Sequence, residues 1–332
     1  MTTGLVLADA ALPFDSALWE RLHQAAMPRQ VRVVSLADSD ALRAALAEAE
    51  IAVLAGDLDE RFLSAPRLKW IHCDHAGLTK SARPEVFARG LVVTGSAGRS
   101  AGALAEHVMM FALLLCSRYP DFYEAQKRHE WLRTPAMKDL RALSGRIMGI
   151  VGMGNSGTAL ATRAQAFGMR VLGYRRREAP LPAGVERVYC ADRGESLDPL
   201  LREADVLALV VNLSDRTRHL LDERAIGLMK PSAVVINLSR GDVIDQDALI
   251  VALREGRLAG AGLDVTSPEP LPPGHPLWDT PNLLITPHFT SALPDRSARS
   301  VEMIVENFRR YAAGEPMLNA ITPDDVWTGA AA

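Results

Sequence analysis

The chain has 332 residues, and at roughly 150 residues per domain this length predicts two domains. Its composition, 48% hydrophobic and 23% charged, is that of an ordered globular protein and excludes a chain that is disordered throughout. The formal net charge of −3 gives no basic field, so we expect neither nucleic acid nor an anionic membrane as a partner.

The cysteines and the apolar runs limit the redox compartment and the membrane topology. Cys73, Cys116 and Cys190 are odd in number, far apart and outside any CxxC spacing, which argues against a disulfide framework and a thiolate metal site. The N-terminus has no basic segment followed by a long apolar one. The longest apolar run, Val108–Cys116, is too short to span a bilayer. We therefore expect a cytoplasmic protein without a metal centre.

Residues 1–95 alternate between short apolar runs and helix-forming segments. The segments Ala17–Ala26 and Ala41–Glu50 carry apolar residues at three- and four-residue spacing, which predicts helices. Strands that alternate with helices imply a parallel sheet covered on both faces, so we predict a small α/β domain without a glycine-rich motif. The predicted strands are Leu5–Ala8, Val31–Leu36, Ile51–Ala55, Leu68–Ile71 and Leu91–Thr94.

A long helix is predicted to follow, over Ala101–Arg118, after the break at Gly95-Ser96-Ala97-Gly98. It is apolar nearly all round, so it should be buried on several sides. It is either a plain core helix or, as we favour, a helix between domains and subunits. The polar segment Pro120–Leu143 has no regular pattern and is predicted to run over the surface or over a partner subunit.

The most informative stretch is 145–177, in which an apolar run at Ile147–Val151 precedes a Gly-x-Gly-x-x-Gly turn, a helical pattern and a second apolar run. This order predicts the βαβ unit that binds dinucleotides. Gly152 permits the tight turn, Gly154 lets the backbone approach a pyrophosphate, and Gly157 lets the helix pack close to the strand. The helix begins near Asn155 and Ser156, and its free N–H groups would face the phosphates.

The rest of the second domain repeats the alternation of strands and helices. A final amphipathic helix over Asp295–Ala313 has too little chain after it for a further domain, so we expect it to pack on the first domain. The predicted strands are Val206–Val211, Ala233–Leu238, Gly260–Val265 and Leu283–Ile285, and the predicted helices are Asp222–Gly227 and Asp245–Glu255.

Three ionisable residues follow these strands, where parallel sheets bind their ligands. They are Arg240, Glu269 and His288. Together they suit hydride transfer to a 2-oxo acid: the arginine can hold a carboxylate and polarise the carbonyl, and the histidine can donate a proton. The glutamate would orient the imidazole and favour its charged form. Taken singly, the arginine could be a surface ion pair and the glutamate a solvated turn, but three such residues beside a dinucleotide site favour catalysis.

The motifs resemble the D-isomer-specific 2-hydroxyacid dehydrogenase family, which includes glyoxylate/hydroxypyruvate reductases and phosphoglycerate dehydrogenases. The resemblance extends over nearly the whole chain, in the expected order. The matching segments are Val151–Gly157, Ile236–Gly241, Leu263–Pro270, His275–Trp278 and Thr286–His288, with Leu68–Gly77 and Ala105–His107.

The resemblance implies an α/β fold of two Rossmann-like domains with parallel sheets and, usually, a homodimer. It places a flavodoxin-like substrate-binding domain at residues 1–99 and 289–332, and a dinucleotide-binding domain with the GxGxxG turn at 100–288. It further implies Arg240, Glu269 and His288 as the catalytic triad. The other implied roles are substrate-carboxylate binding by the backbone at Ala76 and Gly77, nicotinamide contact by Asp264, and cofactor contacts by Asn212 and Thr217.

The sequence departs from the family pattern at three positions. Arg175, followed by Arg176 and Arg177, stands where an acidic residue would bind the adenosine ribose. Charge-assisted bonds of about 1.5–3 kcal/mol to a 2′-phosphate would favour NADP(H) over NAD(H) about ten- to a hundredfold, with NAD(H) still possible. The alternative is a solvated basic turn. Ser291 replaces a common glycine and Asn212 a usual proline.

The sequence thus predicts an NADPH-dependent reductase of small 2-oxo acids of the glyoxylate or hydroxypyruvate type. Two alternatives stay open: oxidation of phosphite or another small acid on the same fold, and a non-enzymatic NADP(H)-sensing corepressor or scaffold. His72 and His75 lie near the predicted substrate loop and are spaced by three. We interpret them as pocket or surface residues rather than metal ligands, since no acidic or thiolate partner pattern accompanies them.

Overall fold

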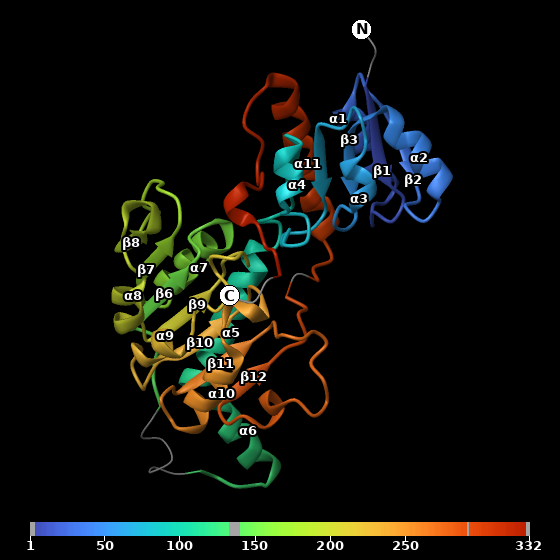
Figure 1. Ribbon diagram of the computed structural model, residues 1–332. Coiled ribbons are helices and arrows are strands. Elements are labelled where there is room, and N and C mark those ends of the chain that lie inside the picture. Colours follow the sequence, from blue (N-terminus) through green and yellow to red (C-terminus); the bar gives the residue numbers. More distant parts are fainter. Residues whose placement is uncertain (1–3, 133–139, 291, 330–332) are drawn as a thin grey trace. The chain divides into compact units, whose positions relative to one another are not determined.

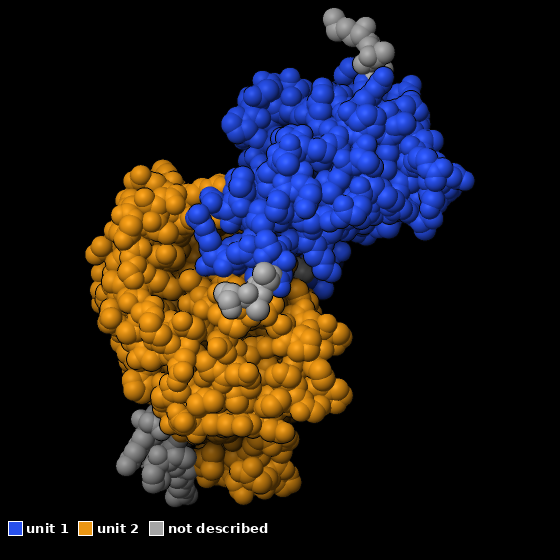
Figure 2. Space-filling model, in the orientation of Figure 1, with its two compact units in different colours: residues 1–99, 214–216, 292–332 blue, residues 100–213, 217–291 orange. Residues whose placement is uncertain are grey.

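The computed structural model describes residues 4–132, 140–290 and 292–329 (Figure 1). The chain forms two compact units, coloured separately in Figure 2. Unit 1 comprises residues 1–99, 214–216 and 292–332, and unit 2 comprises residues 100–213 and 217–291. Each unit contains its own buried hydrophobic cluster and its own sheet, as expected from the length of the chain.

Unit 1 is built around a five-stranded parallel sheet in the order β2-β1-β3-β4-β5. This is the order of flavodoxin-like sheets, which confirms the prediction. The strands are β1 (Leu5–Asp9), β2 (Gln30–Val34), β3 (Ala49–Leu54), β4 (Trp70–Cys73) and β5 (Val92–Gly95). The helices are α1 (Ser16–Ala26), α2 (Ser39–Glu48), α3 (Glu60–Leu63), α4 (Pro84–Ala88) and α11 (Arg296–Ala313).

Local sequence signals explain where these helices begin and end. Asp15 and Asp38 accept hydrogen bonds from backbone N–H groups in the first turns of α1 and α2, which satisfies donors that a helix start leaves open. The second helix ends at Glu48, two residues earlier than predicted. Ala49 and Glu50 belong to β3 instead, because the sheet extends to these residues through pairing of Ala49 with β1.

Helix α11 covers one face of the sheet of unit 1, as predicted for the last helix. Ile304 and Phe308 on its buried stripe join a hydrophobic cluster that includes Trp70 of β4. The Trp70 ring meets Phe308 edge-on, with ring centroids 4.9 Å apart, and stacks on Tyr311 at 5.6 Å. Aromatic pairs of this geometry add about 0.5–1.5 kcal/mol beyond the burial of their surface, so the C-terminal segment is an integral part of unit 1.

Unit 2 contains a seven-stranded parallel sheet in the order β12-β11-β10-β9-β6-β7-β8. This is a doubly wound Rossmann order, in which the order of strand addition reverses between β6 and β9. The strands are β6 (Ile147–Val151), β7 (Arg170–Arg175), β8 (Arg187–Cys190), β9 (Val206–Leu209), β10 (Val234–Asn237), β11 (Gly260–Leu263) and β12 (Leu283–Ile285). The helices are α5 (Ala101–Cys116), α6 (Tyr119–Lys127), α7 (Asn155–Ala166), α8 (Asp198–Glu203), α9 (Glu223–Gly227) and α10 (Gln246–Arg254).

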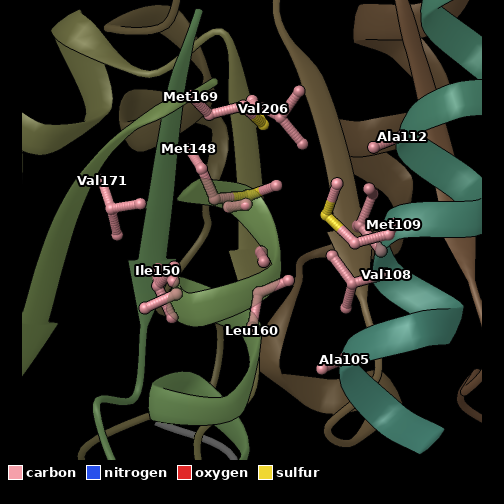
Figure 3. Packing of buried hydrophobic residues seen from close by; sticks show 14 of the residues in the cluster. Ala105, Val108, Met109, Ala112, Met148, Ile150, Leu160, Met169, Val171 and Val206 are labelled. Atoms are coloured by element: carbon pink, nitrogen blue, oxygen red, sulfur yellow. The ribbon is translucent and has the colours of Figure 1, made fainter. Parts of the chain in front are cut away.

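Helix α5 is a core helix of unit 2, packed on α7, β10 and β11. Gly262 in β11 makes this close packing possible, since a Cβ atom there would lie 2.6 Å from Cγ of Phe111. Phe111 is buried, and truncating such a side chain to alanine typically costs about 3–5 kcal/mol. Figure 3 shows the facing side chains: Ala105, Val108, Met109 and Ala112 of α5 opposite Met148 and Ile150 of β6 and Leu160 of α7.

The segment after α5 contains a helix that was not predicted. Residues 119–127 form α6, whereas the sequence predicted only that this segment runs over the surface or over a partner subunit. Only Ala125 of α6 is buried, and therefore the segment has no apolar stripe to signal a helix. Its ends are held instead by the ion pairs Arg118–Asp121 and Glu124–Lys127. The elements β8 and α8 were likewise not predicted, and both are short.

The described residues were compared with the length and hydropathy of membrane-spanning helices, and the state of the cysteines is also clear from them. Among them, no single helix is long and apolar enough to cross a membrane, and only the pair α5 and α6, bent by 66°, passes such a test together. All three cysteines are buried free thiols.

Candidate active site

The glycine turn lies at the carboxyl edge of the unit 2 sheet, where β6 and β9 run side by side and the strand order reverses. Gly152 adopts φ 105°, and a Cβ atom there would lie 2.5 Å from the carbonyl oxygen of Val210. A Cβ atom on Gly157 would lie 2.2 Å from the carbonyl oxygen of Gly152. Both positions therefore require glycine, because any side chain would force the turn and α7 away from the sheet.

The residues of this turn fit a dinucleotide pyrophosphate. Nothing lies within 4 Å of the Cβ position at Gly154, so space is open where the backbone would meet a ligand. Helix α7 begins at Asn155 without a side-chain cap, and Asn155 and Ser156 occupy its first turn. The first N–H groups of an uncapped helix, together with its dipole, attract anions. The turn can therefore bind phosphate groups through the backbone.

Arg175 ends β7 on the same edge of the sheet, where the sequence offers no carboxylate. Its guanidinium donates to the carbonyl oxygen of Pro180 at 3.1 Å and also to that of Ala179. These bonds hold the side chain along its own loop. Arg175 and Arg176 are half-buried and Arg177 is exposed.

Asn212 and Thr217 delimit a loop that follows β9. The Thr217 hydroxyl donates to the Asn212 carbonyl oxygen at 2.7 Å, which closes the loop, while Asn212 itself is exposed. The tip of the loop, residues 214–216, belongs to unit 1. There Asp215 accepts from the backbone N–H of Thr328 at 3.0 Å and donates its own N–H to Val326. This docking of the C-terminal tail was not predicted.

Arg240 follows β10 in a tightly built turn. The buried Asn237 donates from its amide to the Arg240 carbonyl oxygen at 2.9 Å, and Nη1 of Arg240 donates to the Ser239 carbonyl oxygen at 2.7 Å. A Cβ atom on Gly241 would lie 2.2 Å from the carbonyl carbon of Thr266. The turns after β10 and β11 are therefore in direct contact.

Glu269 and His288 form the central pair of the site. The Glu269 carboxylate accepts from the Thr266 N–H through Oε1 at 2.9 Å and meets Nδ1 of His288 through Oε2 at 2.8 Å. A carboxylate on Nδ1 fixes the ring orientation and leaves Nε2 for a substrate. The backbone of His288 has φ 50°, a left-handed conformation that is uncommon outside glycine and costs about 1–3 kcal/mol where it occurs at functional sites.

Asp264 organises the loop that carries His288. It is only 2% exposed, and Oδ1 accepts from the Thr286 hydroxyl at 2.6 Å and from the Phe289 N–H at 3.3 Å. Its Oδ2 accepts from the hydroxyl and N–H of Thr290. Protein donors thus surround the whole carboxylate, and a contact between Asp264 and nicotinamide stays a prediction. Ser291, the next residue of this loop that the sequence singled out, lies outside the described residues.

His107 of α5 supports the same loop. Its Nε2 lies 3.0 Å from the Thr286 hydroxyl, and its ring meets Phe289 edge-on, with centroids 5.4 Å apart. Burial lowers the pKa of His107 and outweighs the opposing attraction of Asp264. The Ala105–His107 segment matched a family motif, but the sequence did not show that its histidine contacts the loop before His288.

The predicted substrate loop of unit 1 follows β4. Ala76 is exposed and Gly77 half-buried, whereas His72 is fully buried and lies within hydrogen-bonding distance of Thr94 and Ser96. His75 sits 3.4 Å from Asp57 through Nε2. His72 is thus a core residue rather than a pocket or surface residue, and His75 lies beside the Asp57 carboxylate. No group of three or more potential metal-ligating side chains occurs among the described residues.

A buried ion pair that sequence reasoning missed fixes the start of this loop. Arg99 and Asp74 are 5% and 2% exposed at the side chain and lie 2.6 Å apart, and Arg99 also donates to the hydroxyl of Ser300 in α11 at 2.7 Å. Burial lowers the pKa of Arg99 and outweighs the opposing effect of Asp74. The sequence did contain one signal for this pair, an arginine within the small-residue stretch Gly95–Ala101. A charged side chain that is buried among such residues requires a partner of opposite charge.

The fold and the site together define a class of protein. A doubly wound parallel sheet with a glycine turn at its switch point, and an arginine, a glutamate and a histidine along the same edge, is typical of NAD(P)-dependent oxidoreductases. The family model for "D-isomer specific 2-hydroxyacid dehydrogenase, NAD binding domain" matches residues 109–290. The chain belongs to the D-isomer specific 2-hydroxyacid dehydrogenase family and is an NAD(P)-dependent oxidoreductase that binds a nicotinamide dinucleotide.

The similarity to known proteins covers nearly the whole chain. A glyoxylate reductase of Korarchaeum cryptofilum is 35% identical over 321 residues, which cover 94% of this chain and 91% of that protein. A D-isomer specific 2-hydroxyacid dehydrogenase from Xanthobacter autotrophicus, solved in complex with NADPH and MES, is 29% identical with a TM-score of 0.80, covering 97% of this chain and 98% of that one. A family protein from Aeromonas salmonicida is 31% identical with a TM-score of 0.74, covering 98% and 100%.

Proposed function

We propose that this protein reduces a small 2-oxo acid of the glyoxylate or hydroxypyruvate type to the D-2-hydroxy acid, with NADPH as the preferred reductant. The observation that carries the proposal is the 2.8 Å contact between Glu269 and His288 on the sheet edge that also bears the glycine turn. The 35% identity to a glyoxylate reductase over 94% of the chain supports the substrate class.

The proposed reaction assigns one task to each residue of the triad. When bound, NADPH supplies the hydride that adds to the carbonyl carbon of the substrate. His288 donates a proton from Nε2 to the carbonyl oxygen, so the products are the hydroxy acid, NADP⁺ and neutral imidazole. Glu269 stabilises the charged imidazole before this transfer. Arg240 holds the substrate carboxylate and polarises the carbonyl with its planar set of donors.

The remaining predicted residues bind rather than react. In this proposal unit 1 is the substrate-binding domain, and the backbone N–H groups at Ala76 and Gly77 receive the substrate carboxylate. Unit 2 is the dinucleotide-binding domain. Its glycine turn, with Asn155 and Ser156, binds the pyrophosphate, and Asn212, Thr217 and Asp264 lie along the rest of the cofactor.

A panel of substrates tests the proposed activity. Purified protein is mixed with NADPH and, separately, with glyoxylate, hydroxypyruvate and larger 2-oxo acids, while oxidation of NADPH is followed by its absorbance. Formate and phosphite with NADP⁺ test the alternative of small-acid oxidation. We expect turnover with at least one small 2-oxo acid and a product of D configuration. Tight NADPH binding without turnover of any compound would contradict the proposal and favour the non-enzymatic sensor.

The preference for NADPH is proposed from the basic end of β7. Arg175, Arg176 and Arg177 stand where a carboxylate would repel a 2′-phosphate, and a relative 29% identical to this chain was solved with NADPH. One charge-assisted bond of about 1.5–3 kcal/mol corresponds to a preference of about ten- to a hundredfold in kcat/KM. The measurement compares kcat/KM for NADPH and NADH. A preference of the unchanged protein for NADH would refute this part of the proposal.

We also propose a homodimer formed through unit 2. Helices α5 and α7 present a largely apolar hollow of about 520 Å³ in which Met110, Leu113 and Phe167 are exposed at 37–45%. A second copy of the chain would cover this surface. Light scattering coupled to size exclusion should give a dimer for the unchanged protein and a monomer for Leu113→Lys. A monomeric unchanged protein at micromolar concentration would exclude the homodimer.

A further inference from the structure

The loop that carries Glu269 is held by the side chain of Gln246. Nε2 of Gln246 donates to the carbonyl oxygen of Ser267, and Oε1 of Gln246 accepts from the N–H of Ser267 at 3.0 Å. One side-chain amide thus pairs with both backbone polar groups of a single residue. Two simultaneous bonds from a planar amide fix the position and the orientation of that backbone, which a single bond would not.

Gln246 is itself fixed, because it is the first residue of α10. The side chain of Asp245 caps this helix by accepting from the Ala248 N–H at 3.1 Å, and the Asp245 N–H donates to the Leu221 carbonyl oxygen. Leu249 and Leu253 are buried on the inner face of the helix. The amide of Gln246 therefore extends from a rigid base to a loop without regular secondary structure.

The bonds of this loop lead from Ser267 to the proposed acid/base residue. Thr266, which precedes Ser267, donates its N–H to Oε1 of Glu269 at 2.9 Å, and Oε2 of Glu269 meets Nδ1 of His288 at 2.8 Å. The side chains of Glu269 and His288 are 37% and 42% exposed. Packing therefore covers little more than half of each, and their alignment depends on the hydrogen bonds that hold the loop.

Within the loop, the Thr266 hydroxyl donates to the Pro268 carbonyl oxygen at 2.9 Å, and the opposite side of the loop meets a neighbouring turn. A Cβ atom on Gly241 would lie 2.5 Å from the Ser267 nitrogen, so the turn after Arg240 abuts this backbone. Contact of this kind limits movement toward the turn but not rotation of the peptide or movement away from it. The two bonds from Gln246 restrain both of these movements.

We propose that Gln246 is a positioning residue for the reaction: by holding the backbone of Ser267 it keeps Glu269 aligned on His288. The inference rests on the proposed function, in which that pair transfers the proton. Gln246 does not touch the reacting atoms. Its loss should therefore impair proton transfer far more than it impairs binding of either substrate.

Three variants separate this role from a purely structural one. Gln246→Leu keeps the size of the side chain and removes both bonds. Gln246→Glu keeps the acceptor for the Ser267 N–H and removes the donor. Asp247→Asn changes the exposed neighbour on the same helical turn and serves as the matched control. For each protein, kcat and KM for the 2-oxo acid and NADPH are measured across pH, with the melting temperature.

We expect kcat of Gln246→Leu to fall about 10- to 100-fold, the usual consequence of displacing a reacting group by about 1 Å. KM for NADPH should change by less than about threefold, and Asp247→Asn should match the unchanged protein. With the carboxylate displaced, the pH profile of kcat for Gln246→Leu should differ from that of the unchanged protein, whereas the profile of Asp247→Asn should not. Gln246→Glu should be intermediate. A lower melting temperature with unchanged kcat and pH profile would overturn the proposal.

A spectroscopic measurement tests the role of Gln246 independently of the proposed function, because it does not require turnover. If the unchanged protein reduces no 2-oxo acid, the proposed function fails, and Gln246 is tested through the Glu269–His288 contact alone. Nitrogen-15 spectra of labelled histidine report the Nδ1 hydrogen bond of His288, whose signals are assigned by their loss in His288→Asn. Gln246→Leu should abolish the signature of that bond, and its persistence would refute the positioning role.

Discussion

His72 should make the stability of the protein sensitive to acid. Its ring lies in the core of unit 1, where burial, reinforced by the charges of Arg99 and His75, lowers its pKa to about 3. The hydrogen-bond directions suit a neutral ring. The Thr94 hydroxyl accepts from Nε1 of Trp70 at 2.8 Å and can donate its own hydrogen to an unprotonated Nδ1 of His72 at 3.0 Å. A proton on Nδ1 would break this arrangement.

The pH dependence follows from the two pKa values. An unfolded histidine titrates at about 6.5, so below that pH the unfolded chain binds a proton that buried His72 does not. The stability that His72 contributes is complete above the unfolded value and is lost as the pH falls toward the folded value. Between about pH 7.5 and about pH 5 the loss is about 2 kcal/mol, from 1.36 kcal/mol per pH unit below 6.5.

The assay compares His72→Gln with the unchanged protein by urea unfolding at both pH values. Glutamine retains groups that can bond Thr94 and Ser96 but does not titrate. We expect the unchanged protein to lose about 2 kcal/mol more than His72→Gln on acidification. His23→Gln, at an exposed position of α1, controls for the removal of a histidine outside the core. Equal losses in all three proteins would show that buried His72 is not the cause of the acid sensitivity.

Three further predictions concern the site. Asp264→Asn replaces an acceptor by a donor beside the N–H groups of residues 289 and 290, so kcat should fall about 10- to 100-fold; an effect confined to NADPH binding would instead support a nicotinamide contact. Glu269→Gln should lower kcat about 10- to 100-fold with NADPH binding retained, and an unchanged kcat would exclude a role of Glu269 in orienting His288. Arg175→Asp should lower the NADPH/NADH ratio of kcat/KM at least about tenfold, while Arg187→Asp, at the far end of β8, should not.

The sequence allowed both sheets and the edge of the site to be predicted because their signals are local. Buried parallel strands appear as short apolar runs, and the glycine turn has strict steric needs that Gly152 and Gly157 meet in the structure. Because parallel sheets bind ligands beyond the carboxyl ends of their strands, Arg240, Glu269 and His288 were predicted to lie on one edge of the sheet of unit 2. The structure shows the Glu269–His288 contact directly, whereas the roles of these residues remain predictions.

The elements and contacts that escaped prediction depend on partners distant in sequence. Helix α6 has no apolar stripe, so periodicity could not reveal it. The Arg99–Asp74 pair joins residues 25 positions apart, and the small residues around Arg99 do not indicate which acidic residue it pairs with. Gln246 looks like an ordinary polar residue at a helix start, and only the folded chain shows that its amide holds the backbone 21 residues later.

The proposed role of His288 is tested most directly by the rate of NADPH oxidation with glyoxylate or hydroxypyruvate, measured for the unchanged protein and for His288→Asn under the same conditions. A general acid contributes about 100- to 10,000-fold, so we expect clear turnover by the unchanged protein and a loss of at least about 100-fold in the variant, with NADPH binding retained. Undiminished turnover by His288→Asn, or none by the unchanged protein with any small 2-oxo acid, would contradict that role.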